Sequence, residues 1–199
     1  MRKIIALSFT TLDGVMQAPG GPGEDTSGDF KYGGWSFPFF DDFMGEVMSR
    51  QMGHEFDLLL GRKTYEIFAA YWPLQKDPVA VSLNNARKYV VTETLGKLDW
   101  NNSYTIIGDL PGEIRKIKET EGPEIQVHGS GNLIQTLWKN NLVDELWLKI
   151  FPVVVGSGKR LFADGNFASG FELLESKTSP SGVIVANYKR SGEVRTGSF

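Results

Sequence analysis

The chain has 199 residues, of which 41% are hydrophobic, with no cysteine and a formal net charge of −3. This length and composition suit one globular domain over residues 1–199 and exclude disordered and fibrous classes. A chain without cysteine has no disulfide scaffold and no thiolate metal site. Because there is neither a basic surplus nor a run of lysine and arginine, we expect no nucleic-acid partner.

The amino terminus carries a short apolar run after Met1-Arg2-Lys3, which is too short for the core of a signal peptide. No apolar stretch approaches the roughly 18 residues that span a membrane. We therefore expect a soluble, cytoplasmic protein that does not bind membranes.

The first third of the chain alternates apolar runs with glycine-rich and periodic segments. In order, we predict a strand over 4–9 near the sheet centre, a long loop over 17–36, a helix from about 38 to 53, a strand over 57–60 and a short helix over 64–70. The long loop is rich in Gly, Pro and Asp. It is either a binding loop or a surface excursion.

The middle of the chain continues the alternation. We predict strands over 88–92 and 103–107, a helix over 109–121 with Asp109 as its N-cap, and a strand over 125–127 that runs into a glycine-rich turn. A helix through Leu133 to about Asn140 follows. Alternating strands and helices imply parallel strands joined by right-handed crossovers.

The last third predicts strands without helices between them. A long strand over 144–155 is interrupted by Pro152, and two strands over 171–177 and 183–189 flank a Ser-Pro-Ser-Gly turn. The final pair is typical of an antiparallel hairpin. We therefore expect an α/β protein with a mostly parallel central sheet and an antiparallel C-terminal hairpin.

Two predicted strand-to-helix turns carry glycine and other small residues. They are Leu60-Gly61-Arg62-Lys63-Thr64 and His128-Gly129-Ser130-Gly131-Asn132. The N-terminus of a helix attracts phosphate, and glycine lets a phosphate approach the backbone. Each turn alone is equally explained by tight turning, but two in one sheet favour a dinucleotide. Neither G-x-G-x-x-G nor a P-loop motif is present, which excludes a standard Rossmann domain and a P-loop NTPase.

Several polar and aromatic side chains could have either a functional or a structural role. His54 and His128 are the only histidines, and without a cluster of convergent ligands we expect no metal. One of Asp41, Asp42 and Glu46 could donate a proton, or all three could form a solvated helix face. The aromatic residues at the end of the long loop could stack on a flat heterocycle or anchor the loop to the core.

The motifs together resemble the dihydrofolate-reductase-like superfamily, and more closely the reductase domain of bacterial riboflavin-biosynthesis proteins. The resemblance covers nearly the whole chain and rests on the segments L-G-R-K-T-Y at 60–65, A-R-K-Y-V-V-T at 86–92, G-S-G-N-L at 129–133 with L-V-D-E-L at 142–146, and F-P-V-V-V-G-S-G-K-R-L-F at 151–162. It implies a three-layer fold, a homodimer, and hydride transfer from NADPH to a small flat substrate.

The resemblance also implies roles for particular residues. Those expected to bind NADPH are Gly61, Arg62, Lys63, Thr64, Thr92, Gly129, Ser130, Gly131, Asn132 and Leu133. Those expected to contact the substrate are Asp13, Trp35, Phe39, Tyr65 and His128, with Asp42 as the catalytic acid.

The chain departs from the riboflavin-pathway reductases at two points. His128 replaces a glutamate before the glycines, and residues 66–73 lack an Asp-Asp-Pro segment. We therefore expect a reductase related to 5-amino-6-(5-phosphoribosylamino)uracil reductase or to dihydrofolate reductase, acting on a different substrate. The alternatives are a non-catalytic nucleotide-binding module and a structural dimer without a ligand.

Overall fold

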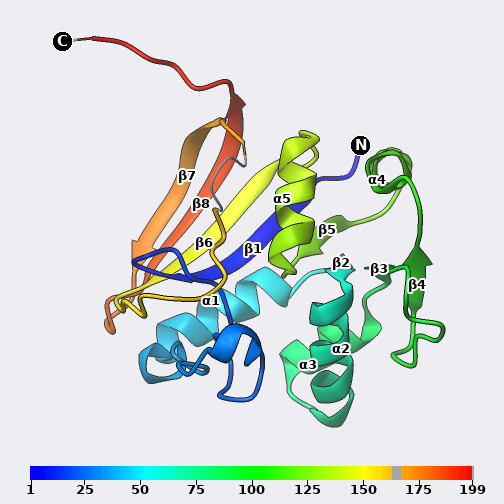
Figure 1. The fold of residues 1–199 in the computed structure, drawn as a ribbon, viewed down its shortest axis with the longest axis horizontal. Coiled ribbons are helices and arrows are strands. Elements are labelled where there is room, and N and C mark those ends of the chain that lie inside the picture. The colour runs from blue at the N-terminus through cyan, green and yellow to red at the C-terminus, as the bar shows by residue number, and fades with distance from the viewer. Residues whose placement is uncertain (163–166, 199) are drawn as a thin grey trace.

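The protein folds around one eight-stranded sheet with helices on both faces (Figure 1). The computed structural model describes residues 1–162 and 167–198. The strands are β1 Ile4–Thr11, β2 Phe56–Gly61, β3 Lys88–Val91, β4 Ser103–Ile106, β5 Glu124–Val127, β6 Glu145–Phe151, β7 Gly170–Thr178 and β8 Ile184–Gly192. The helices are α1 Asp42–Met52, α2 Arg62–Tyr71, α3 Pro78–Asn85, α4 Leu110–Glu119 and α5 Gly131–Lys139.

The strands lie in the order β4-β3-β2-β5-β1-β6-β8-β7. All pairs from β4 to β6 are parallel, whereas β8 is antiparallel to both β6 and β7. The predicted α/β fold with a mostly parallel sheet and an antiparallel C-terminal hairpin is confirmed. The position of β1 inside the sheet explains why this strand is apolar on both faces.

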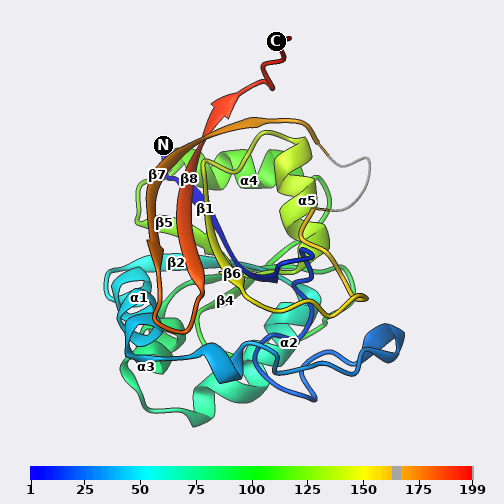
Figure 2. The same cartoon turned by 90° about the vertical axis from the view of Figure 1, so that its left-hand side faces the viewer.

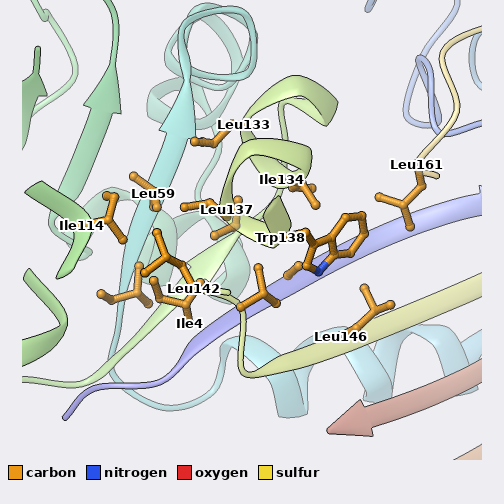
Figure 3. Close-up of a cluster of buried hydrophobic side chains, with 14 of the residues drawn as sticks. Ile4, Leu59, Ile114, Leu133, Ile134, Leu137, Trp138, Leu142, Leu146 and Leu161 are labelled. Atoms are coloured by element: carbon orange, nitrogen blue, oxygen red, sulfur yellow. The ribbon is translucent and has the colours of Figure 1, made fainter. Parts of the chain in front are cut away.

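Successive residues of a central strand pack into the core on opposite faces of the sheet. Leu59 packs with Ile114 of α4 and Trp138 of α5 on one face (Figure 3). Its neighbours Leu58 and Leu60 point to the opposite face, where α1, α2 and α3 lie. Figure 2 shows α4 and α5 on one side of the sheet and α1 and α3 on the other. The chain therefore forms three layers, with the sheet in the middle.

Local chemistry moves several boundaries away from the predicted ones. The first helix begins at Asp42 rather than near Pro38, because Asp41 accepts a 2.9 Å hydrogen bond from the Met44 amide as N-cap. The strand predicted to reach residue 155 ends at Phe151, since Pro152 has no N–H to donate. The helix α3 was not predicted, although Asp77 caps it and Pro78 opens it.

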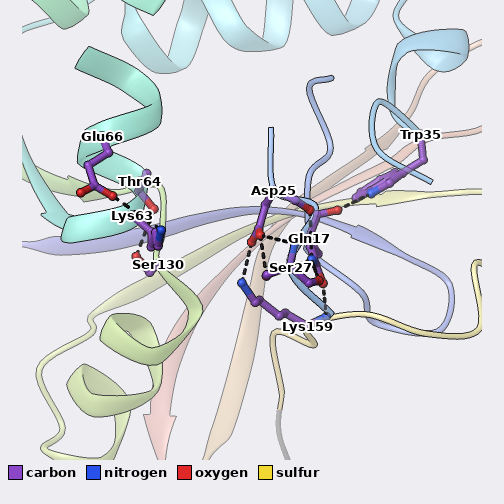
Figure 4. Close-up of polar contacts among 9 residues, drawn as sticks. All are labelled: Gln17, Asp25, Ser27, Trp35, Lys63, Thr64, Glu66, Ser130 and Lys159. Atoms are coloured by element: carbon purple, nitrogen blue, oxygen red, sulfur yellow. Dashed lines mark hydrogen bonds and ion pairs between the residues drawn. The ribbon is translucent and has the colours of Figure 1, made fainter. Parts of the chain in front are cut away.

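The long loop before α1 is tied to the rest of the chain. Gln17 donates to the Ser27 carbonyl at 2.8 Å, and the Trp35 indole donates to the Gln17 carbonyl at 2.7 Å. Lys159 forms a 2.6 Å ion pair with Asp25 (Figure 4). The loop is therefore a packed excursion with defined contacts.

Candidate nucleotide site

The two glycine-bearing turns lie side by side at the carboxyl edge of the sheet. Because β2 and β5 are parallel neighbours, the segments that follow them emerge at the same edge. The Gly61 amide donates to the Gly129 carbonyl at 3.4 Å, and the Thr64 and Ser130 hydroxyl oxygens are 3.2 Å apart (Figure 4). The peptide bond between Gly129 and Ser130 is cis. Segments distant in sequence thus form one surface, at the edge where open α/β sheets bind ligands.

Glycine is required at both turns because the backbones approach so closely. A Cβ at Gly61 would overlap the Ser130 hydroxyl oxygen. A Cβ at Gly129 would lie 2.8 Å from the Thr64 hydroxyl oxygen, and the φ of +138° at Gly129 is itself unfavourable for other residues. The contact between the turns therefore depends on two residues without side chains.

The helices that start at these turns lack side-chain caps. Asp41, Asp77 and Asp109 each accept a hydrogen bond from the first turn of α1, α3 and α4. The N-cap residues of α2 and α5, Gly61 and Ser130, make no such bond. The first N–H groups of these two helices are therefore available to an anion, which the helix dipole also attracts.

Cationic side chains stand in front of α2. Arg62 and Lys63 pair with Glu66 at 3.2 and 3.8 Å, and both cationic residues are exposed while Glu66 is partly exposed. Surface ion pairs of this kind contribute little to stability, so Arg62 and Lys63 lose little free energy when they leave Glu66 to pair with a phosphate. Both side chains can therefore reach an anion at the turn.

The remaining residues expected to bind the cofactor differ in what they offer. Asn132 is exposed, whereas Leu133 is buried in the core, so only its backbone N–H faces the turn. Thr92 follows β3 at the same edge, but its hydroxyl oxygen already accepts from the amides of Thr94 and Leu95 at 3.2 and 3.1 Å. The structure thus brings together the α2 and α5 turns more directly than Thr92.

Three of the residues expected to contact substrate are occupied by structural contacts. Tyr65 is a buried residue of α2, and its hydroxyl oxygen accepts a hydrogen bond from the Trp100 amide at 3.0 Å. Trp35 is buried with its ring edge-on to Phe151 at 5.3 Å between centroids. Phe39 packs edge-on to the same ring at 6.1 Å. Trp35 and Phe39 anchor the loop to the core, and the structure does not place any of the three against the glycine turns.

Asp13 connects two loops. It accepts hydrogen bonds from the Thr11 hydroxyl at 2.6 Å and from the Gly156 amide at 2.9 Å. These bonds stabilise the carboxylate and lower the pKa of Asp13, with the Thr11 contact as the main cause. The carboxylate therefore fixes the turn after β1 against residues 155–160.

Asp42 is not among the residues of α1 that pack on the sheet. The residues of α1 that face the sheet are Met44, Val47 and Gln51, whereas Asp42 is exposed in the first helical turn. Its negative charge complements the helix dipole there. The helical period places Asp42 on the exposed side of α1, and its role as the catalytic acid stays a prediction.

A buried polar cluster lies beside the turn that follows β5. Gln126 and Lys149 are buried strand residues, Gln51 comes from α1, and His128 follows β5 immediately before Gly129. Lys149 donates to the side-chain oxygen of Gln51, and its ammonium lies 5.4 Å from the centre of the Phe9 ring. Burial lowers the pKa of Lys149 to about 7.

Sequence reasoning found His128 but missed Gln51, Gln126 and Lys149. The signal was present for two of them, because Gln126 interrupts the apolar run Ile125–Val127 and Lys149 interrupts the run 146–151. Polar residues in strands buried on both faces need buried partners. Gln51 had no such signal, since a glutamine on an amphipathic helix is ordinary.

The opposite edge of the sheet carries a groove of about 610 Å³. It is lined by residues that precede the strands, among them Arg2, His54, Arg87 and Pro123. None of the residues expected to bind NADPH or substrate lies there. Among the described residues there is no cluster of three or more His, Asp or Glu suited to a metal, and no described helix is long and apolar enough to cross a membrane.

The fold and the paired turns define a class of proteins, the α/β proteins with the dihydrofolate reductase fold. Dihydrofolate reductase from Enterococcus faecalis, solved with NADP(H) and RAB-propyl, superposes with a TM-score of 0.62 at 13% identity, covering 95% of this chain and 96% of that one. A putative riboflavin biosynthesis protein from Shewanella gives 0.68 at 19% identity, over 95% and 99% of the chains. A pyrimidine reductase-like protein from Corynebacterium diphtheriae gives 0.62 at 14%, over 98% and 93%.

Comparison of the sequence with known families identifies the family of this chain. The RibD C-terminal domain model matches residues 2–185, and the chain belongs to this family. YyaP of Bacillus subtilis (strain 168), a protein of uncharacterized function, is 30% identical over 196 residues, which is 96% of each chain. The resemblance predicted from the motifs is confirmed. The family and these structural neighbours support an oxidoreductase in general.

Proposed function

We propose that the protein is an NADPH-dependent reductase that transfers a hydride to a small heterocyclic substrate. The observation that carries the proposal is the meeting of two helix N-termini without side-chain caps, joined by the 3.2 Å contact between Thr64 and Ser130. Two neighbouring anion sites suit the separated phosphates of a dinucleotide. As the family resemblance implies, we also propose a cytoplasmic homodimer.

The residues of the two turns fit this cofactor. Gly61 and Gly129 let the two helix N-termini come together, because a Cβ at either position would meet a hydroxyl of the other turn. Arg62 and Lys63 supply positive charge, and the amides of residues 131–133 supply free N–H groups. When bound, NADPH supplies the hydride, while the protein orients the reactants and excludes water.

The proposal is tested by titrating NADPH calorimetrically into the wild-type protein and Arg62→Ala. Loss of a charge-assisted phosphate contact is expected to weaken binding by about 1–3 kcal/mol. Arg115→Ala is the matched control, because Arg115 is exposed on α4, whose first turn is capped by Asp109. Equal affinities for wild type and Arg62→Ala would count against the site.

The position of Asp42 favours a second candidate, a module that binds NADPH without turning it over. Asp42, the expected acid, is exposed on α1 and is not packed against the sheet. Incubation with NADPH and a panel of pterins, flavins and quinones separates the two functions. Oxidation of NADPH with any of these compounds would eliminate the non-catalytic candidate.

A further inference from the structure

The side-chain amide of Gln126 has only one possible orientation. Its nitrogen lies 2.8 Å from the Gln51 backbone carbonyl and 3.0 Å from a carboxylate oxygen of Glu124. A backbone carbonyl accepts hydrogen bonds and never donates them, so the atom facing it must be the NH₂ group. The Gln126 side-chain oxygen is therefore fixed on the other side, where it can only accept.

This orientation fixes the tautomer of His128. The Gln126 side-chain oxygen lies 3.0 Å from Nε2 of His128, so Nε2 must carry the proton. Burial and the nearby Lys149 lower the pKa of His128 to about 3, which keeps the ring neutral. Nδ1 then has no proton and presents a lone pair.

The lone pair of Nδ1 receives no hydrogen bond from any group within residues 1–162 and 167–198, and His128 keeps part of its surface exposed. His128 directly precedes the Gly129-Ser130 turn, and its ring lies 6.1 Å from that of Phe68, which comes from α2. The groups that face the cluster are Gln51 from α1, Glu124 and Gln126 from β5, and Phe9 and Lys149 from β1 and β6.

We propose that His128 is a specificity-determining residue whose Nδ1 accepts a hydrogen bond from an N–H group of the substrate. The proposal rests on the proposed function, since it places the substrate beside the NADPH turns. A site with a fixed acceptor selects flat heterocycles with a ring N–H, such as lactams, over analogues that lack the donor. His128 has no proton at Nδ1 to give, so it recognises the substrate without acting as the acid.

The tautomer is measurable in the ligand-free protein by nitrogen-15 NMR. His54→Gln leaves His128 as the one histidine in the chain. We expect a pyridine-like signal for Nδ1 and a pyrrole-like signal for Nε2, unchanged between about pH 5 and 8 because the lowered pKa lies outside this range. Protonation of Nδ1, or titration near the ordinary value of a histidine, would overturn the proposal.

Gln126 supplies the variant that tests the cause of the tautomer. Gln126→Met removes the acceptor opposite Nε2 and should yield a mixture of tautomers. A purely structural role for Gln126 would not move these signals selectively. If Gln126→Met does not fold, the wild-type spectrum still decides which nitrogen of His128 carries the proton.

The ligand arm uses uracil and lumazine, with their N-methylated counterparts as probes. Binding of an N–H compound should shift the Nδ1 signal. The substitution His128→Phe should weaken the binding of these compounds about tenfold, which is the effect of one lost hydrogen bond. The affinities of the N-methylated compounds should not change in His128→Phe. If no N–H compound shifts Nδ1, or if methylation makes no difference, the acceptor role is refuted. A shifted Nδ1 in a protein that fails to bind NADPH would support the acceptor and refute the reductase.

Discussion

At the scale of single residues, the approach of Gly61 to Ser130 sets how closely the two turns can meet. The φ of −73° at Gly61 is open to any residue, so Gly61→Ala tests space alone. We expect a loss of about 1–3 kcal/mol in the free energy of unfolding, because the new methyl group overlaps the Ser130 hydroxyl. Ser130→Gly should relieve most of this cost in the double variant. Denaturation of all four proteins in a double-mutant cycle gives the coupling, and strictly additive effects would contradict the contact.

Lys149 makes stability depend on pH. Below about pH 7 both folded and unfolded chains hold its proton, and the cost of the buried ammonium is fully present. Between about pH 7 and 10.5 the unfolded chain binds more protons, so stability should rise with pH, by at most about 1.4 kcal/mol per unit.

Lys149→Met removes this dependence. We therefore expect the stability of wild type relative to Lys149→Met to increase as the pH rises from 7 to 10, measured by urea denaturation. Lys88 also has a lowered pKa, of about 8, but it is present in both proteins and cancels in the difference. Parallel pH profiles would show that the buried amine is not the cause.

At the scale of elements, the five helices divide by their first turns. Asp109 caps α4, whereas Ser130 leaves α5 uncapped. Asp109→Ala should cost about 1 kcal/mol of stability and leave NADPH affinity unchanged. Ser130→Ala removes no capping bond, so its loss of stability should be smaller, while NADPH binding weakens by about 0.5–1.5 kcal/mol. Calorimetric titration and thermal denaturation of both variants make the comparison, and the reverse pattern would contradict an anion site at α5.

At the scale of the whole molecule, β7 forms one edge of the sheet and exposes Leu173 and Leu174, each about half accessible. An exposed apolar edge strand is suited to pairing with a second chain. For the proposed homodimer, we expect Leu173→Lys combined with Leu174→Lys to favour the monomer. Light scattering of the variant and wild type measures this, with Val81→Lys on the exposed side of α3 as control. A dimer that persists in the double variant would place the interface elsewhere.

Most of the architecture could be predicted from sequence because strand runs and glycine turns are local signals. The helix α3 was not predicted, because its eight residues, Pro78–Asn85, show little helical periodicity of apolar side chains. The cluster of Gln51, Gln126 and Lys149 was not predicted, because its members come from three elements that only the tertiary fold brings together. The exposure of Asp42 could not be predicted for a related reason, since composition marks a helix as acidic but only packing decides which side faces the sheet.

The central place of β1 has a consequence for how the chain acquires its structure. Ile4 pairs with Ile125 and Ile5 with Glu145, so β1 is synthesised well before the strands that pair with it. Its apolar faces stay uncovered until most of the polypeptide has left the ribosome. Contacts of such high sequence separation slow folding and expose the nascent chain to aggregation. Chaperone dependence during synthesis is therefore expected to be set by this strand, and a circular permutant that begins after β4 would bring its partners forward.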